Sequence, residues 1–188
     1  MDEFAQLVKD KQVLLVGNGN SLIEKDNSKL IDSYEFVIRF NLSINKDHRY
    51  IGKKIDGWFY TMVSEEKCKR FYNSAKIRPK HCIRHHSSPL DIGEKNYFIN
   101  TNIYRKKINQ LLNIEEGYHP SSGLCCINYL MEYCDTKSVS IIGFDSFSTK
   151  NFYESSHRLS GIKTRHKPDI EKDYLSKLSN ENQIQIID

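Results

Sequence analysis

The chain has 188 residues, of which 28% are charged and 38% are hydrophobic, a composition typical of a folded domain rather than a disordered chain. Its net charge of +4 is modest, and the basic residues are scattered instead of gathered, which argues against a nucleic-acid-binding protein. We therefore predict one domain over residues 1–188 with no nucleic-acid partner.

No segment contains the run of about 18 apolar residues that a membrane-spanning helix needs. The acidic start, Met1-Asp2-Glu3-Phe4, is also not typical of a secretion signal. We expect the chain in the cytoplasm and leave open peripheral association with the inner face of the membrane.

The five cysteines are odd in number and contain no C-x-x-C pair, which argues against a disulfide framework. Cys125 and Cys126 lie within an apolar helical run and are predicted to be buried thiols. His81, His85 and His86 have no matching acidic or thiol partner nearby, so we interpret them as strand-end residues rather than metal ligands.

Apolar periodicity predicts an alternation of strands and helices along the chain. In chain order we predict a strand at 12–16, a short helix at 28–31, strands at 35–40 and 56–60, a helix at 65–75, a strand at 81–84, helices at 100–113 and 124–133, a strand at 138–142, a helix at 168–178, and a last strand at 183–187. The helix at 100–113 is expected to bury Ile103, Ile108, Leu111 and Leu112. The pattern predicts a single Rossmann-like α/β domain, a mostly parallel sheet with helices on both faces.

Ligands of such sheets bind beyond the carboxyl ends of the strands, where Gly17, Asn41 and Gly143 would all lie. The segment from Val16 to Leu22, VGNGNSL, is a glycine turn whose backbone amides could face a phosphate. It lacks features of a dinucleotide site, because Leu22 replaces the third small residue and no acid follows the second strand. A plain strand-to-helix turn without a ligand stays open as the alternative.

Five motifs follow one another in a set order: Gly17-Asn18-Gly19-Asn20-Ser21, Phe40-Asn41, Pro120-Ser121-Ser122-Gly123, Gly143-Phe144-Asp145, and His166 to Glu171. This order resembles the sialyltransferase superfamily. The first part, through Ile51-Gly52-Lys53-Lys54 and Phe59-Tyr60, is most similar to the bacterial family 42 enzymes. The part from His119 to Phe144 resembles the short sialylmotif of the animal-type family 29 enzymes, and His166 with Glu171 fits their histidine, four residues, glutamate motif. Residues 68–118 match poorly.

The resemblance implies a GT-A-like variant without the metal-binding Asp-x-Asp triplet, which this sequence lacks. By resemblance, the donor nucleotide would be held by Gly17, Asn18, Gly19, Ser21 and Asn41. Ser121, Ser122 and Gly123 would open a helix whose positive end faces the phosphate of cytidine monophosphate, CMP. An ordinary serine N-cap is the alternative for these residues.

Tyr153 matches a family 42 tyrosine that stabilises the departing phosphate, where a phenol donor is useful because negative charge grows there. The second such tyrosine is replaced by Phe147, which has no hydroxyl, so Asn151 or His157 could substitute for it. The alternative for Tyr153 is an aromatic ring that packs beneath a loop.

His166 is the predicted general base, since an imidazole with a pKa of about 6.5 can take the proton of an acceptor hydroxyl. The resemblance implies an inverting, metal-independent transfer of sialic acid from CMP-sialic acid to a glycan hydroxyl, in the synthesis of a cell-surface polysaccharide or lipooligosaccharide. The alternatives are another CMP-linked 2-keto sugar acid, such as CMP-Kdo, and a catalytically weak nucleotide-binding module. No cofactor is expected, and the sequence names neither the acceptor nor the oligomeric state.

Overall fold

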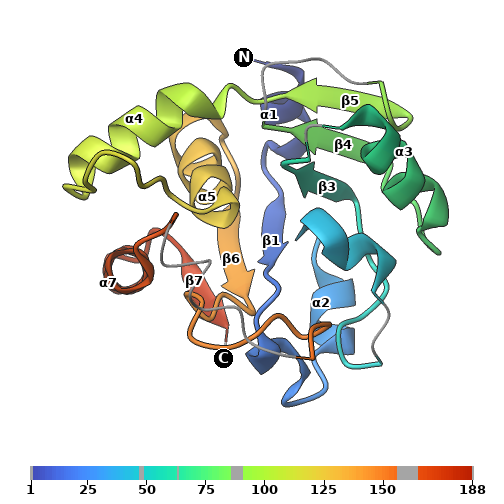
Figure 1. The fold of residues 1–188 in the computed structure, drawn as a ribbon. Helices are drawn as coiled ribbons and strands as arrows, with labels where there is room; N and C mark the ends of the chain where they lie inside the picture. Colours follow the sequence, from blue (N-terminus) through green and yellow to red (C-terminus); the bar gives the residue numbers. More distant parts are fainter. Residues whose placement is uncertain (1, 47–48, 63, 86–90, 156–164, 188) are drawn as a thin grey trace.

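A computed structural model describes residues 2–46, 49–62, 64–85, 91–155 and 165–187. Within these ranges, seven parallel strands form one sheet in the order β5-β4-β3-β2-β1-β6-β7 (Figure 1). The strands are β1 Gln12–Val16, β2 Phe36–Phe40, β3 Gly57–Tyr60, β4 His81–Arg84, β5 Lys95–Phe98, β6 Ser138–Ile142 and β7 Gln185–Ile187. The predicted α/β fold with a parallel sheet is confirmed.

Helices cover both faces of this sheet. They are α1 Glu3–Val8, α2 Ser28–Ser33, α3 Glu65–Ser74, α4 Thr101–Leu111, α5 Ser122–Tyr133 and α7 Pro168–Asn180, with short 3-10 helices η1 Asn20–Ile23 and η2 Asn41–Asn45. Figure 1 shows α4, α5 and α7 on one side of the sheet and α2 and α3 on the other.

The central strands are apolar on both faces because each face packs against helices. In β1, Val13 and Leu15 join the core beneath α1, α4, α5 and α7, whereas Leu14 and Val16 pack with Ile31 of α2 on the opposite face. All four of these β1 side chains are buried. Their continuous apolar run is therefore the pattern expected of an internal parallel strand.

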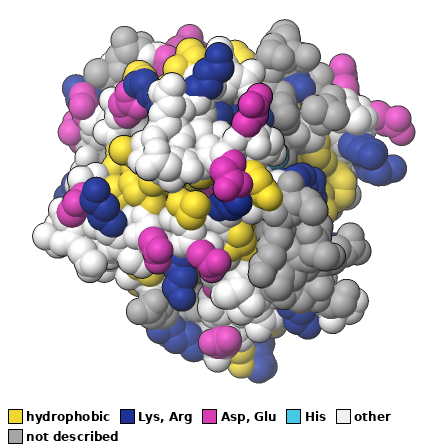
Figure 2. Space-filling view, turned by 60° about the vertical axis from the view of Figure 1, so that its left-hand side comes forward, with side chains coloured by type: hydrophobic (Ala, Val, Ile, Leu, Met, Phe, Trp, Pro, Cys, Tyr) yellow, Lys and Arg dark blue, Asp and Glu magenta, His cyan; other side chains and the backbone are white. Residues whose placement is uncertain are grey.

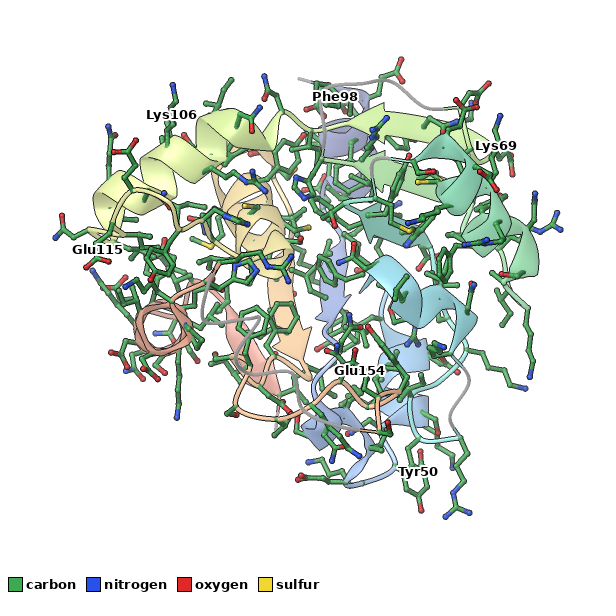
Figure 3. All side chains as sticks on the ribbon, viewed as in Figure 1. Tyr50, Lys69, Phe98, Lys106, Glu115 and Glu154 are labelled. Atoms are coloured by element: carbon green, nitrogen blue, oxygen red, sulfur yellow. The ribbon has the colours of Figure 1, made fainter. Side chains whose placement is uncertain are left out.

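Two elements were not predicted from the sequence, α1 and β5. Asp2 caps α1 by accepting a hydrogen bond from the Ala5 amide, at 2.7 Å. β5 lies at an edge of the sheet, where Phe98 is 48% exposed (Figure 3), and its polar residues lack a strand-like apolar pattern. Pairing with β4, and not its own composition, makes this segment a strand.

The predicted apolar face of α4 is wrong for two of its four residues. Ile103 and Leu111 are 52% and 60% exposed, and they share a stripe with Lys107 at a spacing of four residues. The buried stripe instead contains Tyr104 and Ile108, whose side chains join the core. Tyr104 decides the orientation, because its ring packs edge-on against Tyr129 of α5 at a centroid distance of 5.6 Å.

The topology places a crevice at the carboxyl end of β1. The chain builds β1 to β5 outward in one direction and then crosses over to place β6 on the other side of β1. Strand order reverses at this point, so the loops after β1 and β6 diverge and leave room for a ligand. The register pairs Val16 with Ile142, so both strands end at the same level.

The five cysteines are buried and form no disulfide, as predicted for Cys125 and Cys126. His81 begins β4 and His85 follows it, whereas His86 lies outside the described residues.

In the part of the chain that the structure describes, no helix is long and apolar enough to cross a membrane. On the face drawn in Figure 2, acidic and basic side chains are interspersed.

Candidate active site

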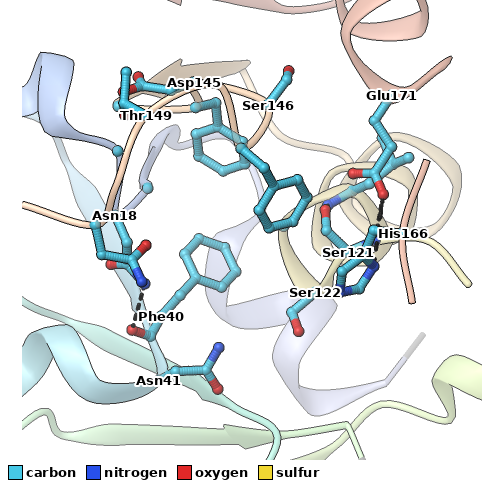
Figure 4. A pocket seen from close by; sticks show the side chains of 18 of the residues that line it. Asn18, Phe40, Asn41, Ser121, Ser122, Asp145, Ser146, Thr149, His166 and Glu171 are labelled. Carbon is cyan, nitrogen blue, oxygen red and sulfur yellow. Dashed lines mark hydrogen bonds and ion pairs between the residues drawn. The ribbon is translucent and has the colours of Figure 1, made fainter. Parts of the chain in front are cut away.

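A cavity of about 330 Å³ lies at the carboxyl ends of the central strands. Eight of the ten predicted site residues line it: Gly17, Asn18, Gly19, Asn41, Ser121, Ser122, Gly123 and His166. Figure 4 shows the side chains of Asn18, Asn41, Ser121, Ser122 and His166 around this cavity. They come from four separate parts of the chain, so the fold and not sequence proximity brings them together. The remaining two, Ser21 and Tyr153, do not line it.

The glycine turn after β1 is packed against the loop after β6. A Cβ atom on Gly17 would overlap with the carbonyl oxygen of Gly143, and one on Gly19 would overlap with the carboxylate of Asp145. The Gly19 amide donates to the Gly143 carbonyl at 2.9 Å. Glycine is required at position 17 because the two backbones approach more closely there than any side chain allows, and at position 19 a side chain would displace the Asp145 carboxylate.

Asp145 fixes this packing through its carboxylate. The carboxylate accepts hydrogen bonds from the Ser21 amide, at 3.1 Å, and from the hydroxyls of Ser21 and Thr149. Thr149 in turn accepts from the Asn20 amide at 2.9 Å. Ser21 thus anchors the glycine turn from behind the cavity. Asp145 occurs in the Gly143-Phe144-Asp145 motif, but its role could not be predicted from the sequence because its partner Ser21 lies in a distant turn.

Two asparagines offer amide groups at the ends of β1 and β2. The Oδ1 atom of Asn41 accepts from the amide and the hydroxyl of Thr61, both at 3.0 Å, so its NH₂ group must point the other way. Asn41 lies in the left-handed region, with φ of 50°, which asparagine tolerates better than most residues. The Oδ1 atom of Asn18 is buried with no hydrogen-bond partner among the described residues. Both side chains can therefore bond a polar ligand.

The N-terminus of α5 forms the opposite wall. Ser121 is its N-cap and accepts from the Leu124 amide at 3.2 Å, while the Ser121 amide donates to Glu171 at 2.9 Å. The amides of Ser122 and Gly123 belong to the first turn, whose N–H groups have no partner within the helix. With the positive end of the helix dipole, they form a favourable site for an anion.

His166 stands beside this helix with a defined tautomer. Its Nδ1 atom lies 2.8 Å from the backbone carbonyl oxygen of His119, which can only accept, so Nδ1 carries the proton. Nε2 is then left with a free lone pair, as a base requires. Burial lowers the pKa of His166 below its ordinary value of 6.5, although the bond to His119 acts in the opposite direction. The imidazole is therefore neutral at pH 7.

Glu171 is buried, with 3% of its surface exposed, and lies 4.0 Å from Nδ1 of His166 (Figure 4). That distance is too long for a hydrogen bond, and the Nδ1 proton is already donated to His119. Burial raises the pKa of Glu171 to about 7, and its hydrogen bonds with Ser121 offset this only in part. Glu171 bonds the Ser121 amide at the start of α5, and its raised pKa makes it take up a proton more readily than an exposed glutamate.

Tyr153 lies outside the cavity lining. Lys46 sits over its ring, 5.5 Å from the centroid, and Phe152 packs against it edge-on at 5.0 Å. Burial raises the pKa of Tyr153 to about 12, so the phenol keeps its proton. Its predicted contact with the departing phosphate stays a prediction.

The two residues proposed to substitute for a missing tyrosine differ in where they lie. Asn151 lines the cavity and donates to Glu154 at 2.9 Å. His157 lies outside the described residues. Further lining residues that sequence reasoning missed are Thr61, Thr149, Glu154 and Arg165. None belongs to a recognisable motif, and Arg165 is missed although it directly precedes His166.

Most hydrogen-bond donors that line this cavity are neutral hydroxyl and amide groups, which can bind an anion. Asp145 already accepts three hydrogen bonds, and the Glu171 carboxyl has a raised pKa. Among the residues that the structure describes, no group of three or more His, Cys, Asp or Glu side chains is arranged to hold a metal ion. Hydroxyls, amides and a helix end can instead bind a phosphate next to an imidazole base.

No protein-family model matches the chain, and no curated protein sequence matches it either. Several solved structures share its fold. A mammalian sialyltransferase superposes with a TM-score of 0.66 at 18% identity, covering 97% of this chain and 70% of that one. The sialyltransferase CstII from Campylobacter jejuni in complex with CMP gives a TM-score of 0.64 at 16% identity, covering 95% of this chain and 79% of the other.

A second CstII structure, in complex with CMP-3FNeuAc, has a TM-score of 0.62 and 18% identity over 94% of this chain and 79% of that one. At such low identities the likeness establishes the fold. The chain therefore has the α/β fold of these sialyltransferases, with its cavity at the carboxyl ends of the strands.

Proposed function

We propose that this protein is a glycosyltransferase that transfers sialic acid from CMP-sialic acid to a hydroxyl of a glycan acceptor. The observation that carries the proposal is the state of His166, whose Nδ1 proton is fixed on the His119 carbonyl and whose Nε2 is a free base beside an anion-binding helix end. The shared fold supports it, because the similar C. jejuni enzyme was crystallised with CMP and with CMP-3FNeuAc.

In the proposed complex, the phosphate of the donor lies between the glycine turn and the start of α5. The free amides of Ser122 and Gly123 and the NH₂ group of Asn41 would donate to the nucleotide. The buried Oδ1 of Asn18 would gain the donor that it lacks among the described residues, from a ribose hydroxyl. These contacts would strengthen as negative charge grows on the departing CMP.

The chemical step would be a direct displacement. Nε2 of His166 takes the proton of the acceptor hydroxyl, and its oxygen bonds to the anomeric carbon as the bond from that carbon to the phosphate oxygen breaks. CMP leaves with the bonding electron pair, and the sugar inverts its configuration. We propose that no metal ion is required, since neutral donors and a helix dipole can stabilise a monophosphate leaving group.

Replacement of His166 by alanine tests this proposal. We expect transfer from CMP-sialic acid to fall by about 10²–10⁴-fold, the usual contribution of a general base. His81→Asn is a matched control, because His81 is the first residue of β4, at the end of the strand away from the cavity. Its ring forms a hydrogen bond with the Tyr97 hydroxyl. Unchanged transfer by folded His166→Ala protein would contradict the assignment.

The same assay with CMP-Kdo separates the two candidate donors, since both carry the same nucleotide and an anomeric carboxylate. A catalytically weak binding module is favoured by one observation, the phenylalanine at position 147 where the resemblance implies a tyrosine. Binding of CMP without turnover of either donor would identify the protein as such a module.

A further inference from the structure

The loop after β6 contains a strained turn at the edge of the cavity. Ser146 and Phe147 are consecutive residues with positive φ, 46° and 60°, and the Ser148 amide closes the turn on the Asp145 carbonyl at 2.8 Å. A turn with two left-handed central residues favours Asn-Gly, and a bulky aromatic there is unusual. Such strain persists only where the surroundings hold it, and it often marks a functional position.

The surroundings of this turn do hold it. The carboxylate of Asp145, its first residue, is bonded to Ser21 and Thr149, and the Ser148 hydroxyl donates to the Asp145 carbonyl at 2.6 Å. The turn is therefore tied to the glycine turn after β1, which is itself part of the cavity wall. The loop after β6 and the glycine turn after β1 together fix the direction in which the side chain at position 147 points.

In this orientation, the ring of Phe147 stacks on the ring of His166. The two rings lie 5.0 Å apart at an interplanar angle of 10°, and the ring of His119 meets His166 edge-on at 4.9 Å and 68°. The hydrogen bond to His119 holds the Nδ1 atom in place, and the two ring contacts hold the plane of the imidazole. An aromatic face also stabilises the imidazolium that forms when the base takes a proton.

We propose that Phe147 is a positioning residue, which holds the imidazole of His166 in the plane that aims Nε2 at the acceptor hydroxyl. The inference rests on the proposed function of His166. This role differs from that of the tyrosine that the resemblance implies at this position, whose hydroxyl would contact the phosphate. Stacking on His166 uses only the face of the ring and needs no hydroxyl. The strained backbone is retained because a relaxed turn would direct the side chain elsewhere.

Three variants separate this role from simple filling of space. Phe147→Asn relieves the backbone, because asparagine accepts left-handed φ, but it removes the ring. Phe147→Leu keeps an apolar side chain without a flat face, and Phe147→Tyr keeps the face. Phe98→Leu, on the exposed edge strand β5, is the control for loss of a phenylalanine.

We expect kcat to fall at least tenfold in Phe147→Asn and Phe147→Leu, with KM for the donor changed less than about threefold, and Phe147→Tyr to stay within threefold of the wild type. The Tm of Phe147→Asn should stay within a few degrees, because relief of strain offsets the lost contact. A changed KM with unchanged kcat would overturn the proposal, since it would place Phe147 on the donor. Wild-type kcat in Phe147→Leu would overturn it as well.

Nitrogen NMR of the histidine rings tests the inference independently of turnover. In the wild type the His166 signals should show one tautomer, protonated on Nδ1, and in Phe147→Asn they should keep this tautomer, which the His119 carbonyl sets, but broaden because the plane of the ring is no longer held. Identical line widths in both proteins would overturn the positioning role. If the wild type transfers no sugar but the signals change as expected, the proposed function fails while the positioning of His166 stands.

Discussion

At the scale of single residues, the behaviour of the proposed base depends on which nitrogen of His166 carries the proton. The His119 carbonyl fixes that proton on Nδ1, and burial lowers the pKa of the ring below 6.5. The ring can then act as a base through Nε2 at any pH above its pKa. Phe147 adds the orientation of the plane, which a single hydrogen bond leaves free to rotate.

The lowered pKa of His166 predicts the acid limb of the pH profile. Below this pKa the ring is an imidazolium with no lone pair on Nε2, so kcat/KM should fall about tenfold per pH unit. Because the pKa is lowered, the fall due to His166 should begin below pH 6.5. The same profile in Glu171→Gln removes the separate titration of Glu171, whose pKa burial raises to about 7. Rates measured from pH 5 to 8, with the fold monitored by circular dichroism, check this. An acid limb centred above pH 6.5 in Glu171→Gln would contradict the lowered pKa of His166.

At the scale of elements, the start of α5 combines two functions in adjacent serines. Ser121 stabilises the helix, since its hydroxyl caps the Leu124 amide and its own amide is bound by Glu171. Ser122 lines the cavity, and its hydroxyl has no hydrogen bond to a described residue. The sequence alone cannot distinguish a capping serine from a ligand-binding one, but the geometry does.

Alanine replacements of these two serines should therefore have different effects. Ser121→Ala should lower stability by about 1 kcal/mol, or about 2–4 °C in Tm, because a helix cap is lost. Ser122→Ala should leave Tm within about 1 °C and weaken CMP binding several-fold, because a single hydrogen bond contributes about 1 kcal/mol. Thermal unfolding and titration calorimetry of the two variants measure both effects. Equal losses of stability would contradict the division of roles.

At the scale of the whole molecule, the cavity joins the two halves of the sheet at β1 and β6. The glycine turn after β1 and the loop after β6 hold each other through Asp145 and Gly143. A ligand that bonds both loops and the start of α5 connects parts of the chain more than 100 residues apart. Its binding should therefore stabilise the fold as a unit.

Nucleotide binding should appear as a rise in Tm that depends on the base. At about 100 times its Kd, CMP should stabilise the fold by about 2.7 kcal/mol, or about 5–10 °C for a domain of this size. UMP and AMP at the same concentration should give smaller shifts if the site is built for cytidine. Differential scanning fluorimetry with the three nucleotides measures this. Equal shifts would show that the site binds the phosphate without selecting the base.

Much of the fold could be predicted because its internal strands and amphipathic helices have strong local patterns. The strands at 12–16, 81–84 and 138–142 match β1, β4 and β6 residue for residue. β5 was missed because an edge strand buries little, and the exposed side of α4 was misassigned because Ile103 and Leu111 look like core residues in sequence. In both places, neighbouring elements decided what local composition could not.

By itself, the sequence determined the alternation of strands and helices, the glycine turn and the order of the motifs that end at His166 and Glu171. These features are local, since they depend on side-chain periodicity and on residues a few positions apart. Only the tertiary structure decided the tautomer of His166, the hydrogen bonds of Asp145, the stacking of Phe147 and the place of Tyr153 outside the cavity. Each depends on a contact between distant segments, which exists only once the loops after β1 and β6 have packed together.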